Sequence, residues 1–146
     1  MDKLELKDIA PYLPYKPIVI VNDTERNLTA VSIDSEFVFV TQWKGSREKQ
    51  MIKIENIKPI LRPMSDLTKE ITHNGETFVP LHRILEAYCF DLAKMDKKEI
   101  QSYAESLIEI DISYRVLKML AEWHIDFQDL IGRDLAINLN EVDNGK

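Results

Sequence analysis

The chain has 146 residues, 45% of them hydrophobic, so its length fits one domain or two small subdomains that share a core. Its net charge of −6, from 25 acidic and 19 basic side chains, argues against binding to nucleic acid or to anionic membrane surfaces. The single cysteine, Cys89, cannot form an internal disulfide, and no apolar run approaches the roughly 20 residues that span a bilayer. With a polar N-terminus in place of a signal peptide, the composition predicts a cytoplasmic protein.

Residues 1–62 are predicted to form a small antiparallel β subdomain. A short helix is expected first, with Leu4, Ile9 and Leu13 on its apolar face and prolines at its end. Strands are then expected at residues 17–21, 28–33, 36–42 and 51–54, with the first turn at residues 22–27. Four short strands joined by hairpins are too few for a sandwich, so we expect a β-meander or a small, partly open SH3-like barrel.

A joint between two kinds of structure is predicted at residues 57–67. Pro59 and Pro63 bar a helix across this stretch, and Ser65 offers an N-cap for a single helical turn after it. Acidic residues are concentrated beyond the joint, with 9 acidic and 10 basic residues up to Arg62 but 16 and 9 after it. The second subdomain, residues 63–146, is expected to pack beside the first as one compact unit.

A β-hairpin and about three helices are predicted for this second subdomain, which makes the fold class α+β. Asn74-Gly75 tolerates the positive φ angles of a tight hairpin turn and lies between β-prone residues. Pro80 suits the first turn of a helix, Asp96 and Glu99 have capping-box spacing for the next, and Ser113 caps the third. A short strand at residues 108–112 is also expected. The predicted apolar stripes are Leu81, Ile84, Leu85, Tyr88 and Leu92, then Ile100, Tyr103, Ala104 and Leu107, then Val116, Leu117, Leu120 and Trp123.

No catalytic, cofactor-binding or metal-binding residues are predicted. His124-Ile125-Asp126 is the nearest approach to a metal site or a general-base pair, but a catalytic zinc needs three protein ligands, and His73 and His82 lack ligand spacing. We therefore expect His124 to interact with the C-terminus of the third helix. Cys89 is interpreted as a small apolar residue rather than a nucleophile, since no base accompanies it.

Acidic residues in the second subdomain are the remaining candidates for a divalent-cation site. Their irregular spacing is more typical of a solvated surface, which is the interpretation that we favour. The residues concerned are Glu105, Glu109, Asp111, Asp126, Asp129 and Asp134.

The candidate interaction surface comprises Trp43, Lys44, Arg47 and Lys49, in a polar loop of the first subdomain. A tryptophan beside basic residues on a small β-structure is typical of nucleic-acid modules, and exposed aromatic residues are also enriched at protein interfaces. The interpretation that we favour is a solvated hairpin whose charges keep a sheet edge from pairing wrongly, with Trp43 folded back over that edge. Further basic residues of this part of the chain are Lys53, Lys58 and Arg62.

Three stretches of the chain resemble a family of small, uncharacterised proteins found in prophages and other mobile elements of bacteria. They are residues 9–15, the joint from Ile57 through Leu67 with Thr68-Lys69-Glu70-Ile71 after it, and Glu122-Trp123-His124-Ile125-Asp126 followed by Leu130-Ile131 and Leu135-Ala136-Ile137. The resemblance implies a phage or prophage protein in a bacterial cytoplasm, and it assigns no activity to any residue.

The function predicted from the sequence is that of a small non-enzymatic binding or adaptor protein whose partner is another protein, of phage or host. The runner-up is a nucleic-acid-binding module that uses the basic face from Trp43 to Arg62, and an enzyme without a recognisable motif comes third. No cofactor and no membrane partner are expected.

Overall fold

The computed structural model describes residues 3–32, 36–87, 94–102 and 114–144. The chain forms two compact units. Unit 1 comprises Met1–Pro63 and Ala121–Lys146, and unit 2 comprises Met64–Leu120. The fold is α+β, as predicted, and the described residues form about five short helices, where the sequence suggested a short N-terminal helix and about three more in the second subdomain.

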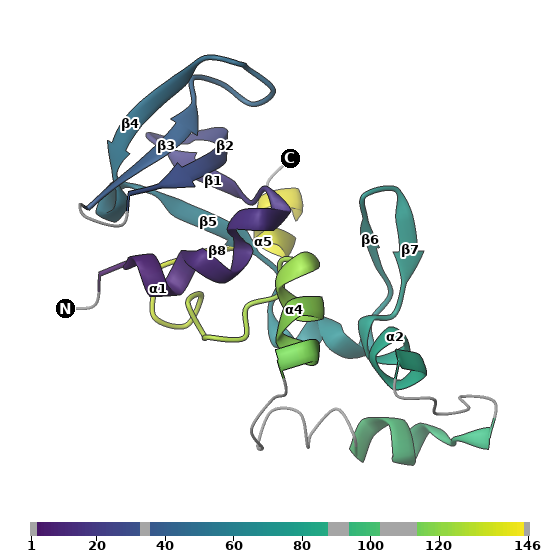
Figure 1. Cartoon of the computed structure of the whole chain (residues 1–146). Helices are drawn as coiled ribbons and strands as arrows, with labels where there is room; N and C mark the ends of the chain where they lie inside the picture. Colours follow the sequence, from purple (N-terminus) through teal and green to yellow (C-terminus); the bar gives the residue numbers. More distant parts are fainter. Residues whose placement is uncertain (1–2, 33–35, 88–93, 103–113, 145–146) are drawn as a thin grey trace. The chain divides into compact units, whose positions relative to one another are not determined.

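The centre of unit 1 is a six-stranded sheet with the order β4-β3-β2-β1-β5-β8 (Figure 1). The strands are β1 (Ile18–Val21), β2 (Thr24–Val31), β3 (Phe37–Thr41), β4 (Lys49–Lys53), β5 (Lys58–Leu61) and β8 (Ile137–Asn138). All neighbours are antiparallel except β5 and β8, which pair in parallel. The sheet is open, with β4 and β8 at its edges, so the expected meander is present but the SH3-like barrel is not.

The turn between β1 and β2 is shorter than predicted. Asn22 and Asp23 alone form it, with φ angles of 49° and 64°, and Thr24 already belongs to β2. Asparagine and aspartate tolerate this left-handed conformation better than most residues, so a two-residue hairpin turn is possible here. Residues 24–27, which the sequence assigned to the turn, therefore belong to β2.

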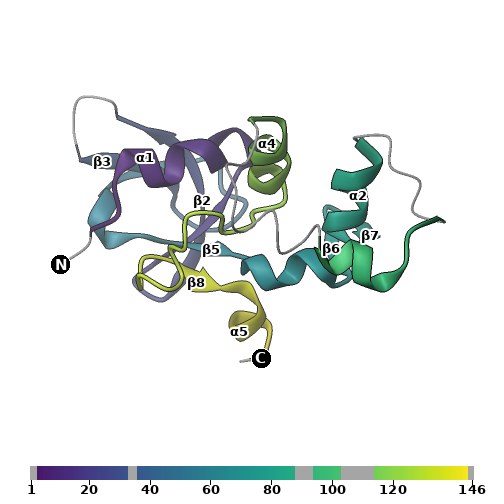
Figure 2. The same ribbon diagram turned by 90° about the horizontal axis from the view of Figure 1, so that it is seen from below.

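One face of the sheet carries the hydrophobic core of unit 1. Alternation along the strands directs Val19, Val21, Leu28, Val38 and Val40 to this face, and all five are buried. Two chain segments cover it, one N-terminal and one C-terminal (Figures 1 and 2). The N-terminal cover comprises α1 (Leu6–Ile9) and a 3₁₀ helix (Ala10–Tyr15), and the C-terminal cover lies within residues 121–136; they contribute Ile9, Tyr12, Ala121, Leu130, Leu135 and Ala136.

The predicted joint is in part a strand of the sheet, which corrects the interpretation of residues 57–67. β5 pairs with β1 at Lys58 and Pro59, and with β8 at Ile60 and Leu61. A proline is compatible with this place because Pro59 lies in the part of β5 that is paired on one side only. Beyond β5, the Arg62 amide donates to the His124 carbonyl and the Asp126 amide donates to the Arg62 carbonyl, each at 2.7 Å.

Unit 2 begins with a 3₁₀ helix (Met64–Thr68) and continues with the predicted hairpin. β6 (Ile71–His73) and β7 (Glu76–Phe78) pair around Asn74 and Gly75, whose φ angles are 51° and 82°. Both residues thus have the left-handed conformation that was inferred from the Asn-Gly pair, and the prediction is confirmed.

Helix α2 (Pro80–Ala87) follows the hairpin and starts at Pro80, as predicted. Its stripe of Leu81, Ile84 and Leu85 is buried, while Tyr88 and Leu92 lie outside the described residues. Residues 97–102 are helical, and the Glu99 amide donates to the Asp96 carboxylate at 2.8 Å, which is half of the expected capping box. The expected strand at residues 108–112 also lies outside the described residues.

Helix α4 (Tyr114–Glu122) has the predicted phase, although Ser113 lies outside the described residues. Val116, Leu120 and Trp123 are buried and Leu117 is half-buried, whereas Arg115, Lys118 and Glu122 are exposed. The last helix, α5 (Leu139–Asn144), follows β8 directly.

Candidate functional site

The face of the sheet opposite the core is exposed at β3 and β4. Phe39 and Met51 are directly paired across the two strands, and they are 37% and 56% exposed. Val38 and Val40, which alternate with Phe39, point into the core and have no exposed surface. The hairpin therefore has one buried apolar face and one apolar patch that nothing among the described residues covers.

Lysines flank this patch along β4. Lys49 is paired with Thr41 and Lys53 with Phe37, so both side chains lie on the face of Phe39 and Met51 by the two-residue period of a strand. Both lysines are exposed. The pattern along β4 on this face is thus cation, apolar side chain, cation.

The loop between β3 and β4 carries Trp43, which is 59% exposed. The loop is ordered by its own hydrogen bonds: the Gln42 amide donates to the Glu48 carbonyl at 3.0 Å, and the Ser46 amide donates to the Trp43 carbonyl at 2.9 Å. The Gly45 amide also donates to the Asn27 side chain of β2 at 3.0 Å. Trp43 is therefore presented to solvent by a structured loop, and it does not fold back over the sheet edge.

We refer to six of the exposed residues of this hairpin as the β3–β4 surface: Phe39, Trp43, Arg47, Lys49, Met51 and Lys53. Of the predicted site residues, Trp43, Arg47 and Lys49 belong to it. Lys44 lies in the same loop, but its ammonium pairs with the Glu25 carboxylate at 3.3 Å, so its charge is largely compensated. Arg47, Lys49 and Lys53 have no carboxylate partner among the described residues.

Two members of the predicted basic face lie elsewhere. Lys58 and Arg62 belong to β5 and to its end, and β5 is separated from β4 by three strands in the sheet order. The Lys58 ammonium forms an ion pair with Asp134 at 3.1 Å. The expected face from Trp43 to Arg62 is thus divided, and Arg47, Lys49 and Lys53 are its part on the hairpin.

Phe39 and Met51 were not among the predicted site residues. By the two-residue period of the predicted strand, Phe39 shares one face with Phe37 and Thr41, but this period does not tell which face is buried. The burial of Val38 and Val40 settles this point, and it leaves Phe39 outside. The nearby cations and the neighbouring Trp43 were the sequence pattern that could have indicated the exposed face.

The three histidines lie in different parts of the fold. His124 follows α4 with a left-handed φ angle of 56°, and its Nε2 atom lies 2.8 Å from the Tyr15 carbonyl oxygen. His73 lies on β6 and His82 on α2, both in unit 2, whereas His124 belongs to unit 1. Among the described residues no three histidine, cysteine, aspartate or glutamate side chains are grouped to hold a metal ion. Cys89 lies outside the described residues.

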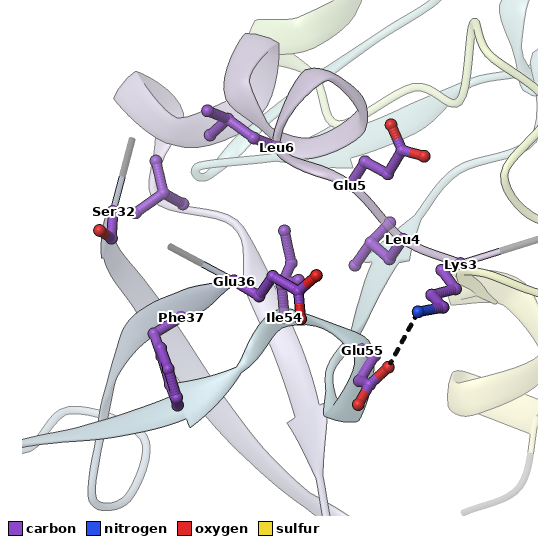
Figure 3. Close-up of a pocket in the computed structure, with 10 residues that line it drawn as sticks. Lys3, Leu4, Glu5, Leu6, Ser32, Glu36, Phe37, Ile54 and Glu55 are labelled. Atoms are coloured by element: carbon purple, nitrogen blue, oxygen red, sulfur yellow. Dashed lines mark ion pairs between the residues drawn. The ribbon is translucent and has the colours of Figure 1, made fainter. Parts of the chain in front are cut away.

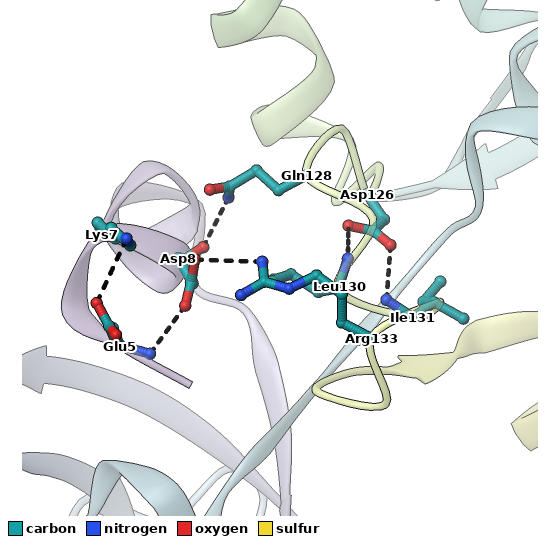
Figure 4. Close-up of polar contacts among 8 residues, drawn as sticks. All are labelled: Glu5, Lys7, Asp8, Asp126, Gln128, Leu130, Ile131 and Arg133. Carbon is teal, nitrogen blue, oxygen red and sulfur yellow. Dashed lines mark hydrogen bonds and ion pairs between the residues drawn. The ribbon is translucent and has the colours of Figure 1, made fainter. Parts of the chain in front are cut away.

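Buried carboxylates hold the covering segments of unit 1 together (Figure 4). The Asp126 carboxylate accepts the amides of Leu130 and Ile131, each at 2.8 Å. The Asp8 carboxylate accepts the Glu5 amide at 2.9 Å and lies 3.7 Å from the Arg133 guanidinium. These contacts give both carboxylates a structural role.

Three of the candidate cation ligands, Asp126, Asp129 and Asp134, have other contacts. Asp126 is occupied by backbone amides and Asp134 by Lys58, and the Asp129 side chain lies against Gly132. The remaining candidates, Glu105, Glu109 and Asp111, lie outside the described residues.

A cavity of about 470 Å³ lies between the N-terminal segment and the β2–β3 end of the sheet (Figure 3). Its lining is mixed, with Leu4, Phe37 and Ile54 as apolar residues and Glu36 as an exposed acid. Lys3 and Glu55 face one another across its rim, with 3.9 Å between the ammonium and the carboxylate. A side-chain set of this kind contains no nucleophile paired with a base.

In the described part of the chain, no helix has the length and apolar character needed to cross a membrane. Neither a protein-family model, nor a curated protein, nor a solved structure matches this sequence.

Proposed function

We propose that this chain is a small non-enzymatic binding protein, an adaptor of a bacterial phage or prophage that acts in the cytoplasm, and that it binds a partner protein through the β3–β4 surface. The observation that carries the proposal is the exposure of three large apolar side chains on one hairpin: Phe39, Met51 and Trp43. Burial of such large apolar side chains is energetically favourable. A group of them that stays exposed to water is typical of a binding surface.

The composition of the β3–β4 surface supports a protein partner. Tryptophan, phenylalanine, methionine and arginine are enriched at the centres of protein interfaces. Phe39 and Met51 form a paired apolar centre, and Lys49 and Lys53 provide a charged rim on the same face. Although the chain as a whole is acidic, the local positive charge of this rim favours a partner segment that carries carboxylates.

A single-stranded nucleic acid is the second candidate ligand. The observation in its favour is that two exposed aromatic side chains, Phe39 and Trp43, lie on a hairpin with three cations that form no ion pair with a carboxylate of the described residues. Bases stack on such aromatic side chains and cations neutralise the phosphates. Against it, Lys58 and Arg62 lie on another strand, Lys44 is compensated by Glu25, and the net charge is −6.

Capture from a bacterial host extract tests the proposal, with three immobilised proteins: wild type, Trp43→Ala and Tyr114→Ala. Tyr114 is a matched control because it is an aromatic side chain that is 77% exposed but lies on α4. The extract is treated with nuclease before capture, and eluted proteins are quantified by mass spectrometry. We expect at least one host or phage protein to be captured by wild type and Tyr114→Ala and to be lost with Trp43→Ala.

The same experiment can contradict the proposal. Equal capture by all three proteins would exclude the β3–β4 surface as the binding site. Binding of an oligothymidylate that weakens steeply as salt rises, and that Trp43→Ala abolishes, would favour the nucleic-acid candidate, because phosphate contacts release counterions.

A further inference from the structure

We infer that the open edge of β4 accepts an extended, acidic segment of the partner protein as an additional antiparallel strand. This inference rests on the proposed function and deepens it, because it names the chemistry of the partner. β4 is the first strand in the sheet order, and within the described ranges of the chain it pairs with β3 alone. An edge strand presents unpaired backbone groups, and strand addition is a common way for a sheet to bind a peptide.

The backbone hydrogen bonds identify the residues of β4 that face the open edge. The Gln42 amide donates to the Glu48 carbonyl, and the Ile54 amide donates to the Glu36 carbonyl at 2.7 Å. The strands stay in register between these two bonds, so every second residue of β4 is hydrogen-bonded to β3. These residues are Gln50 and Ile52. The amide and carbonyl groups of the intervening residues therefore point away from β3: Lys49, Met51 and Lys53.

These same three residues direct their side chains to the exposed face. A strand added in antiparallel orientation would hydrogen-bond to their backbone groups, and its side chains directly opposite them would lie on the same face. Lys49 and Lys53 are about 13 Å apart along the strand by the rise of an extended chain. The complementary segment thus has an acidic residue, an apolar residue and an acidic residue at alternate positions, opposite Lys49, Met51 and Lys53.

A second copy of this chain is a poorer occupant of the edge. Antiparallel pairing of two β4 strands around Met51 places Lys49 opposite Lys53 of the second copy, twice in each pair of strands. Like charges directly opposite one another are destabilising, and edge lysines are a known means of preventing self-association. The lysines therefore disfavour this self-pairing and favour an acidic strand.

A synthetic heptapeptide, Thr-Glu-Thr-Val-Thr-Glu-Thr with capped ends, is the probe. Its binding is measured by NMR titration of the ¹⁵N-labelled full-length protein, and the amide resonances of Lys49, Met51 and Lys53 are expected to shift most. Methylation of the valine amide nitrogen removes a donor that faces β4 and should abolish binding. Methylation of a threonine amide beside it, which faces away, should leave binding unchanged.

Charge reversal tests the selection of the acidic strand. The double variant Lys49→Glu, Lys53→Glu should bind the peptide about tenfold more weakly or worse, and it should bind the peptide with lysines in place of both glutamates. The control variant, Lys97→Glu with Lys98→Glu, has the same change in net charge on exposed residues of unit 2 and should bind like wild type. Circular dichroism and the Tm establish that each variant is folded.

Several outcomes would overturn the inference. They are an absence of shifts at the β4 amides, equal loss with both methylated peptides, equal binding by the charge-reversed protein, or dimerisation of the free chain through β4. If host-protein capture still depends on Trp43 in that case, strand addition is wrong and the protein-binding surface stands. If peptide binding behaves as expected but Trp43→Ala captures every host protein normally, the strand site stands and the proposed role of Trp43 fails.

Discussion

The Tyr12 hydroxyl donates a hydrogen bond of 2.7 Å to the main-chain carbonyl of Ile125, across a sequence separation of 113 residues. Both residues are fully buried, and Tyr12 also packs on the Phe127 ring with 5.5 Å between ring centroids. The bond joins the N-terminal and C-terminal segments that cover the sheet of unit 1. It gives Tyr12 a structural role that its hydrophobic character alone did not predict.

Tyr12→Phe should lower the free energy of unfolding by about 1 kcal/mol, the usual net contribution of one hydrogen bond. The cost is limited because the Ile125 carbonyl also accepts the Phe127 amide at 3.1 Å and is not left unpaired. Urea unfolding measures the difference. Tyr15→Phe is the matched control, since no hydrogen bond of the Tyr15 hydroxyl is formed among the described residues, and it should be nearly neutral. A Tyr12→Phe protein as stable as wild type would contradict the assigned role of the bond.

Stability should also fall above about pH 10, and Tyr12 should account for part of the fall. Burial, reinforced by the nearby Asp126 carboxylate, raises the pKa of Tyr12 above its ordinary value of 10.0. The unfolded chain therefore releases this proton at lower pH than the folded chain. The contribution of Tyr12 ionisation to the free energy of unfolding is complete below about pH 10 and is lost as the pH rises. Unfolding measured at about pH 9 and about pH 11 should show a smaller loss for Tyr12→Phe than for wild type. Identical losses would mean that Tyr12 ionises normally in the fold.

A β-branched residue in the hairpin turn of unit 2 should lower the stability of the protein. Gly75 has a φ angle of 82° and no atom within 4 Å of an added Cβ, so strain in the backbone is the only expected cost of substitution. Gly75→Val should cost on the order of 1 kcal/mol or more, because a β-branched side chain is strained at positive φ. Gly75→Asn is the control and should cost less, since asparagine tolerates this conformation. Equal unfolding free energies for the two variants would contradict the turn assignment.

Two substitutions at positions two residues apart, on opposite faces of α4, test the phase of that helix. Leu120 is 1% exposed, so Leu120→Ala should cost roughly 2 to 5 kcal/mol through lost burial and a cavity. Lys118 is exposed and its ammonium lies 6.0 Å from the Tyr114 ring centroid, so Lys118→Ala should cost under about 1 kcal/mol. Chemical unfolding compares the two. Similar losses would show that the buried face of the helix is misassigned.

The exposure of Trp43 can be measured by fluorescence in a variant that lacks the other tryptophan. In Trp123→Phe, the emission of Trp43 should be red-shifted and readily quenched by iodide or acrylamide, because 59% of its surface is exposed. In Trp43→Phe, the emission of Trp123, which is 5% exposed, should be blue-shifted and protected. A protected, blue-shifted Trp43 would remove the aromatic anchor from the proposed binding surface.

Local patterns in the sequence predicted the elements whose structure depends on neighbouring residues. The Asn74-Gly75 turn, the start of α2 at Pro80 and the buried stripe of α4 all follow from backbone preferences or from helical spacing, which act over a few positions. The α+β class followed from the order of these elements. Trp43, Arg47 and Lys49 were also identified as a candidate surface, because an aromatic residue among cations in a polar loop is recognisable locally.

Only the tertiary structure decided which elements meet and which faces stay open. Pairing of β5 with β8 and of Arg62 with Ile125 joins residues far apart in the chain, and no local pattern specifies such long-range partners. For the same reason Pro59 was read as part of a joint, although its strand lies inside the sheet. Alternation along β3 was visible in the sequence, but the choice of Val38 and Val40 for the core, which leaves Phe39 and Met51 exposed, depends on what covers each face of the assembled sheet.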